Sequence, residues 1–107
     1  MKLIIAIINR DDAGAVTQKL SKNGFSSTRL STTGGFLLAS NVTLLIGVQD
    51  DQVQTVIDLI HESSHSRKQM VPAVTEMSYG FMPVMPVEVT VGGATVFVVD
   101  VERFERL

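Results

Sequence analysis

The chain has 107 residues and a formal net charge of −2, with 45% hydrophobic and 19% charged residues. This length provides a single domain, residues 1–107, with one hydrophobic core, and leaves no room for a catalytic domain plus a lid domain. The acidic balance argues against binding to nucleic acid polymers, because duplex binders displace counterions with a basic surface. The high apolar content favours a protein whose surface is partly covered by copies of itself.

The sequence contains no cysteine. A disulfide framework and a thiolate metal site are therefore excluded. Residues 3–8 form an apolar run directly after Met1 and Lys2. This run is too short for a membrane span and lacks a small-residue cleavage site. We therefore expect a cytoplasmic protein that does not act at a membrane.

The first half of the chain predicts a strand, a helix and a second strand. Residues 3–8 are rich in β-branched side chains, which indicates a strand buried on both faces in the middle of a sheet. Asp11 or Asp12 is expected to cap the following helix, and Gly24 to end it. The apolar side of that helix consists of Ala13, Val16 and Leu20. Residues 25–30 alternate in polarity and predict the second strand.

Residues 32–37, with the sequence TTGGFL, are the first candidate for a ligand site. The paired glycines can turn backbone N–H groups toward an anion, and Phe36 offers a flat apolar face to a base. Thr28 and Asn41 flank this stretch with short polar side chains that can bond to a base edge. The alternative is an ordinary hairpin loop with Phe36 in the core.

The second half repeats the order of strand, acidic pair and helix. Residues 42–48 predict a third strand, in which Gly47 indicates close approach by another backbone or by a ligand. Asp50 and Asp51 are expected to cap a second helix. Its apolar positions follow the spacing i, i+3, i+4 and i+7 of an amphipathic helix: Val53, Val56, Ile57 and Ile60.

Residues 69–75 predict a fourth strand, which Pro72 restricts to an edge or a bulge. Residues 77–86 predict a loop that carries Met and Phe side chains. Such a loop suits a lid or a partner-docking segment, and the alternative is a loop packed under its own side chains.

Residues 87–91 and 94–101 predict two closing strands joined by a turn at Gly92 and Gly93, with a short polar tail at residues 102–107. Two β-α-β halves predict an α+β, ferredoxin-like βαββαβ sandwich, with both helices on one face of an antiparallel sheet and an extra C-terminal strand hairpin.

His61, Glu62 and His65 match the pattern H-E-x-x-H, in which two imidazoles on one helix face bind zinc and the Glu acts as general base. The pattern falls at the end of the predicted helix, and no third ligand follows at a suitable spacing. We interpret it as a solvated helix end and predict neither a metal site nor an enzyme. A metal-dependent enzyme that uses both histidines is the less favoured alternative.

Two motifs point more specifically to a family: TTGGFL at residues 32–37, and PVEV followed by VGGATVFV within residues 86–98. Residues 1–7, Asn41 and residues 47–51 agree in a supporting way. With these motifs, the sequence resembles the PII-like cyclic di-AMP receptor proteins of Gram-positive bacteria, and the resemblance extends nearly from end to end.

The resemblance implies a homotrimer whose subunits pack sheet to sheet, with one nucleotide site in each cleft between neighbours. Thr28 and Asn41 would bond to an adenine edge or ribose, and the residues after the first glycine pair would enclose a base. Gly47 would permit close approach, and Phe97 with the second glycine pair would form the opposite wall from the neighbouring subunit. The implied ligand residues are Thr28, Gly35, Phe36, Leu37, Asn41, Gly47, Gly92, Gly93 and Phe97.

The expected function is a signal receptor that binds cyclic di-AMP, has no cofactor, and signals through residues 77–86 to an unidentified protein partner. Three departures from the family pattern predict weaker binding. Ser26 stands where the family carries a basic residue, and Leu38 and Ser40 replace a basic residue and a glycine. A PII-like module for another adenine nucleotide, such as ATP, ADP or cyclic AMP, is the alternative.

Overall fold

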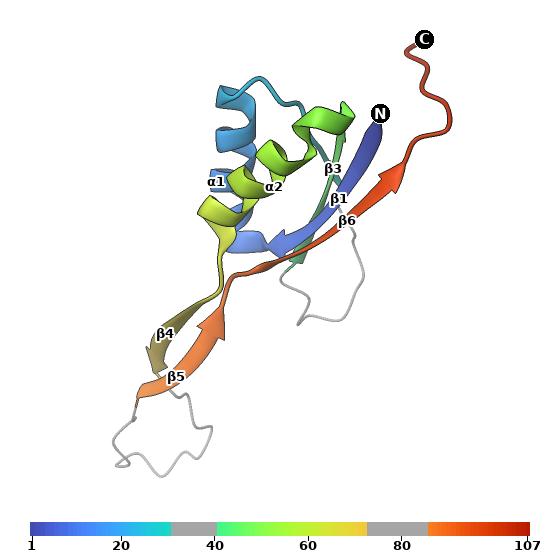
Figure 1. Cartoon of the computed structure of the whole chain (residues 1–107). Coiled ribbons are helices and arrows are strands. Elements are labelled where there is room, and N and C mark those ends of the chain that lie inside the picture. Colours follow the sequence, from blue (N-terminus) through green and yellow to red (C-terminus); the bar gives the residue numbers. More distant parts are fainter. Residues whose placement is uncertain (31–40, 73–85) are drawn as a thin grey trace.

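The computed structural model describes residues 1–30, 41–72 and 86–107. The elements in chain order are β1 (Lys2–Asn9), α1 (Arg10–Lys22), β2 (Thr28–Leu30), β3 (Asn41–Val48), the 3-10 turn η1 (Asp50–Gln52), α2 (Val53–Ser64), β4 (Arg67–Pro72), β5 (Pro86–Val91) and β6 (Ala94–Asp100). One antiparallel sheet has the strand order β2-β3-β1-β6, and β4 pairs with β5 in a separate two-stranded sheet. Both helices lie on one face of the larger sheet, and the β4–β5 arm extends away from it (Figure 1).

The core lies between the helices and the covered face of the larger sheet. The strands contribute Ile4, Ala6, Ile8, Val42, Leu44, Ile46 and Val48, and the helices contribute Ala13, Val16, Leu20, Val56 and Ile60. The predicted apolar side of α1 is thereby confirmed, and that of α2 is confirmed for Val56 and Ile60, with Val53 partly buried against the core. This α+β arrangement is compatible with the expected ferredoxin-like sandwich.

The opposite side of the larger sheet, which we call the open face, carries no helix in the described part of the chain. Its residues, placed by the strand register, are Leu3, Ile5, Ile7, Thr28, Leu30, Asn41, Thr43, Leu45, Gly47, Thr95, Phe97 and Val99. In β1, Ile4 and Ala6 are fully buried whereas Leu3 and Ile5 are only half-buried. The prediction that this strand is buried on both faces is therefore confirmed for one face only.

The predicted helix caps need correction. The Asn9 side chain accepts a hydrogen bond from Asp11 N at 2.8 Å, so Asn9 caps α1. The reason is that Asn9 is the last residue with extended backbone before the helix begins. Gly24 has φ +84° and ends this helix as predicted. Before α2, Gln49 N donates to Gln52 Oε1 at 3.1 Å, and neither expected aspartate caps that helix.

Three predicted strand assignments also change. The second strand is limited to β2, because the residues before it close the turn after α1 and pack Phe25 against the core. β4 begins at Arg67, and residues 73–75 lie outside the described part of the chain. The extra C-terminal hairpin is not confirmed, because β5 pairs with β4 whereas β6 pairs with β1.

Candidate ligand site on the open face

One row of residues crosses the open face at a single level. Thr28 lies opposite Leu45, Leu45 opposite Ile5, and Ile5 opposite Phe97. Because neighbouring strands are about 4.8 Å apart, Thr28 and Phe97 are separated by about 14 Å, at the two outer strands of the sheet. Within one chain, these two predicted ligand residues therefore do not face each other.

Gly47 and Asn41 belong to β3 and lie on the open face, as does Thr28 of β2. Gly47 pairs with Leu3, and a Cβ built on Gly47 would meet no atom of the described residues within 4 Å, its two neighbours in the chain aside. Asn41 begins β3 opposite Asn9, at the other end of the strand, and is exposed. The space above Gly47 is thus open to a group from outside the chain.

A cavity of about 550 Å³ lies at the Gly47 end of the open face. Thr28, Leu45 and Gly47 line it from the sheet, together with residues 24–26 from the segment after α1. Met1, Gln52, Phe104 and Arg106 complete the lining. The volume is within the range of about 300–1,000 Å³ that is usual for small-molecule sites.

Of the charged groups around this cavity, the Met1 amino group forms an ion pair, whereas Arg106 forms none in the described part of the chain. The Met1 amino group lies 3.0 Å from Asp50 Oδ1, and this hydrogen bond lowers the pKa of the Asp50 carboxyl. In residues 1–30, 41–72 and 86–107, no ion pair involves Arg106. Arg29 pairs in register with the buried Leu44, so its side chain is on the helix-covered face.

Gly92 and Gly93 lie between β5 and β6, directly before Ala94, which pairs with Ile8 at the end of β1 that is remote from the Leu3–Gly47 pair. A Cβ on Gly92 would be 2.5 Å from Arg67 Nη1 and 3.2 Å from Asp12 Oδ2. Gly93 N donates a hydrogen bond to Ser64 O. These glycines thus have a structural requirement of their own, whatever they contribute to ligand binding.

The remaining predicted ligand residues, Gly35, Phe36 and Leu37, lie outside the described part of the chain. The same holds for Leu38 and Ser40 and for residues 77–85 of the predicted loop.

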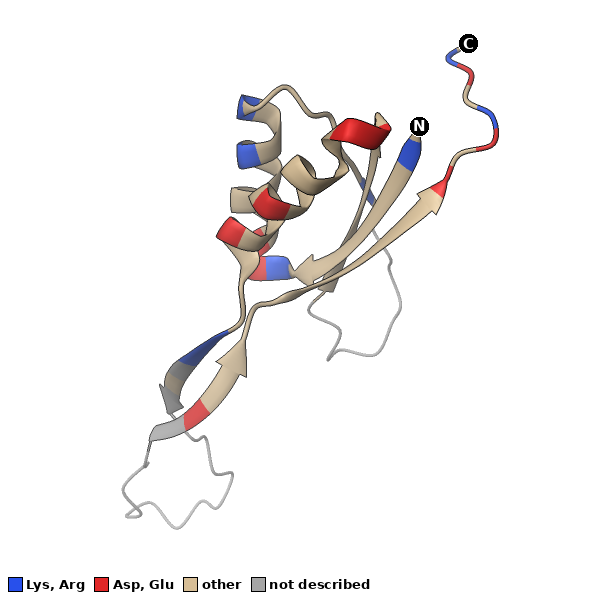
Figure 2. Cartoon of the chain, in the orientation of Figure 1, with Lys and Arg blue, Asp and Glu red and all other residues tan. Residues whose placement is uncertain are grey.

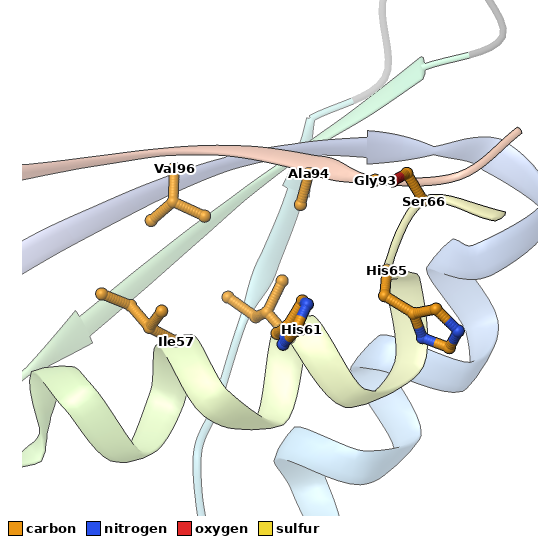
Figure 3. A pocket seen from close by; sticks show the side chains of 8 residues that line it. Ile57, His61, His65, Ser66, Gly93, Ala94 and Val96 are labelled. Carbon is orange, nitrogen blue, oxygen red and sulfur yellow. The ribbon is translucent and has the colours of Figure 1, made fainter. Parts of the chain in front are cut away.

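The H-E-x-x-H histidines line a second cavity, of about 400 Å³, between α2 and β6 (Figure 3). The ring centroids of His61 and His65 are 6.2 Å apart in an edge-to-face arrangement. Ile57, Ala94 and Val96 supply most of the apolar lining. No group of three or more potential metal ligands occurs in the described part of the chain.

The fold and the first cavity define a small α+β domain with one candidate ligand site beside an uncovered sheet face. A family model described as "Cyclic-di-AMP receptor" matches residues 1–107. The chain therefore belongs to the cyclic-di-AMP receptor family, as its motifs predicted, and this is a family of receptors. The chain is also similar to a functionally unknown protein from Pediococcus pentosaceus ATCC 25745, with 38% identity, a TM-score of 0.75, and coverage of 99% of this chain and 96% of that chain. Neither described helix is long and apolar enough to cross a membrane.

Several cavity residues were missed from the sequence, and two of them lie in its last segment. Phe104 and Arg106 belong to the segment read as a polar tail, and only the tertiary structure brings them beside Thr28. The alternation of an aromatic and a basic residue among acidic ones is the signal that could have drawn attention to them.

Proposed function

We propose that this protein is a signal receptor that binds cyclic di-AMP in clefts between the subunits of a homotrimer. Membership of the cyclic-di-AMP receptor family supports the ligand. The observation that best supports a cleft between subunits is the separation of Thr28 and Phe97, which lie on opposite outer strands of one sheet.

The apolar character of the open face supports association through this surface. Phe97, Leu30 and Val99 are 53%, 44% and 42% exposed in the single chain. Large contiguous apolar surfaces of this kind mark interaction sites. In a ring of three copies each contact is heterologous, so two different parts of the subunit surface meet. Such a contact would pair the Thr28 edge of one subunit with the Phe97 edge of the next.

The chemistry of the cleft suits this ligand. Cyclic di-AMP has two purines and two singly charged phosphodiesters, so stacking surfaces and hydrogen-bond donors serve it better than a dense cationic pocket. Stacking of a base on an aromatic side chain contributes about 1–3 kcal/mol. The described cavity lining includes no His, Asp, Glu or Lys side chain that could act as general base. We propose that the site holds its ligand without cleaving it.

The proposal extends to signalling. Ligand occupancy would be relayed through the β4–β5 arm and the predicted loop at residues 77–86 to an unidentified protein partner, in the cytoplasm. Support comes from the arm itself, a two-stranded extension that stands clear of the larger sheet (Figure 1).

A second candidate ligand is another adenine nucleotide, and Ser26 favours it. This neutral side chain lines the cavity where the family resemblance implies a basic residue. A thermal-shift panel of cyclic di-AMP, ATP, ADP and cyclic AMP decides between them. We expect the largest increase in melting temperature with cyclic di-AMP.

The test of the shared cleft uses two variants that damage opposite walls. We expect Thr28→Ala to weaken binding by calorimetry about 5- to 10-fold through one lost hydrogen bond, and Phe97→Ala about 10-fold or more through lost stacking. The two variants are then co-expressed with different tags and purified for both tags. Each mixed trimer contains one cleft with an intact Thr28 and an intact Phe97, so a class of sites with wild-type affinity should reappear.

Thr55→Ala is the matched control, because Thr55 is exposed on α2, away from the cavity. It should bind like the unchanged protein. Absence of any saturable binding by the unchanged protein would reject cyclic di-AMP as the ligand. Absence of high-affinity sites in the mixed trimers would reject a cleft shared between subunits.

A further inference from the structure

The C-terminal tail, residues 101–107, reaches the candidate ligand cavity. Val101 N donates a hydrogen bond to Met1 O at 3.2 Å, which extends the β6–β1 contact by one residue. Beyond this point the tail leaves the larger sheet (Figure 1). Phe104 and Arg106 nevertheless line the cavity together with Thr28 and Gly47. The tail therefore forms a wall of this cavity.

The tail residues alternate in what they contact. Arg103 Nη2 and Glu105 Oε1 are 2.7 Å apart and form an ion pair with each other. Phe104 lies between these two residues in the sequence and Arg106 follows them, and both line the cavity. The charge of Arg103 is thus neutralised within the tail, whereas Phe104 and Arg106 present an aromatic ring and a guanidinium to the cavity.

Arg106 is the basic side chain among the described residues that line this cavity. The tail carries a run of charges of both signs beside strands that carry few (Figure 2). Arg103 is occupied by Glu105, and the Met1 amino group by Asp50, whereas Arg106 has no ion pair in the described part of the chain. A negatively charged ligand in this cavity would therefore be attracted by the Arg106 guanidinium.

We propose that the C-terminal tail is part of the ligand site, with Arg106 binding a phosphodiester of the ligand and Phe104 covering a base. This inference rests on the proposed function and names the residues that supply its charge. A guanidinium can donate two parallel hydrogen bonds to one phosphate, which gives both attraction and orientation. Ser26, which lines the same cavity, offers only a neutral hydroxyl. In this chain the cation for the phosphate comes from the tail.

Calorimetry with cyclic di-AMP tests the role of the tail. Arg106→Ala should weaken binding about 10-fold or more, because a charge-assisted hydrogen bond is lost. Arg106→Lys keeps the charge but loses the two-pronged geometry, so its affinity should lie between those of Arg106→Ala and the unchanged protein. The affinity of the unchanged protein should fall as salt is raised, and that of Arg106→Ala should fall less steeply.

The matched control is Arg103→Ala, which removes the same charge from the same tail three residues away. Arg103 pairs with Glu105 and does not line the cavity, so this variant should bind within about twofold of the unchanged protein. Equal weakening by the two variants would reduce the effect to net charge and overturn the proposal. Arg106→Ala binding as tightly as the unchanged protein would overturn it as well and would leave the proposed function standing. Failure of the unchanged protein to bind would reject both.

Discussion

At the scale of single residues, the backbone conformation of Gly92 connects β5 to β6. Its φ of +79° is one that side-chain-bearing residues rarely adopt. A Cβ would also come within 2.9 Å of the His65 carbonyl oxygen. Without a side chain, Gly92 can adopt this conformation and lie in contact with His65 and Arg67, where the chain passes from β5 to β6.

Gly92→Ala should destabilise the protein by about 1–3 kcal/mol, through backbone strain and steric overlap. Thermal or denaturant unfolding measures this change. Gly14→Ala is the matched control, because Gly14 lies in α1 with no atom within 4 Å of a Cβ. This substitution should raise stability by about 0.5–1 kcal/mol, since alanine favours helix. Equal effects of the two substitutions would remove the case for a steric requirement at Gly92.

At the scale of elements, an ion pair between Arg67 and Asp12 connects the β4–β5 arm to the helical layer. Arg67 Nη2 lies 2.9 Å from Asp12 Oδ1, and the guanidinium also reaches His65 O at 3.3 Å. The hydrogen bond with Asp12 raises the pKa of Arg67 above its usual range. The Asp12 side chain is 8% exposed and that of Arg67 41%. The carboxylate therefore depends on this partner more than the guanidinium does.

This asymmetry predicts unequal costs for the two halves of the pair. Arg67→Ala leaves a buried carboxylate without its partner and should cost about 3 kcal/mol of folding free energy. Asp12→Ala leaves an accessible guanidinium and should cost less, about 1 kcal/mol. Denaturant unfolding gives both values, and hydrogen exchange in β4 and β5 should rise in each variant.

Lys68→Ala is the control for the arm, because Lys68 pairs with the exposed Glu88 at 3.4 Å. It should change stability by no more than about 0.5 kcal/mol. If Asp12→Ala proved more damaging than Arg67→Ala, the burial argument would be wrong.

The elements also show what the sequence could and could not predict. Periodicity and apolar runs found both helices and the central strands β1 and β3, because these elements supply the buried residues of one shared core. Alternation in residues 87–101 correctly indicated strands but could not identify their partners, so the pairing of β5 with β4 was missed. Thr28 was named as a ligand residue because it lies close in sequence to the motif at residues 32–37. Arg106 is far from that motif in sequence, and only the fold brings it to the same cavity as Thr28.

At the scale of the whole molecule, the larger sheet has one covered and one open face, although both are apolar. Residues 3–8 are continuously apolar, yet only alternate positions pack under the helices. A strand that is apolar on both sides indicates that both faces become buried. Under the proposed trimer, the second cover is the sheet of another subunit.

Two adjacent valines of β6 test this assembly. Val98 and Val99 are 41% and 42% exposed, but Val99 lies on the open face opposite Leu3, whereas Val98 pairs with the core residue Ile4. Val99→Glu should leave the isolated subunit folded and prevent trimer formation, because a carboxylate would be buried without a partner at each subunit contact. Val98→Glu makes the same chemical change on the other side of the strand and should stay trimeric.

Light scattering measures the oligomeric state of each valine variant, and calorimetry its affinity for cyclic di-AMP. Because the proposed cleft needs two subunits, Val99→Glu should lose binding together with its trimer, and circular dichroism should show the fold retained. A folded, monomeric Val99→Glu that still bound cyclic di-AMP tightly would place the whole site within one chain. A trimeric Val99→Glu would instead exclude the open face from the subunit contact.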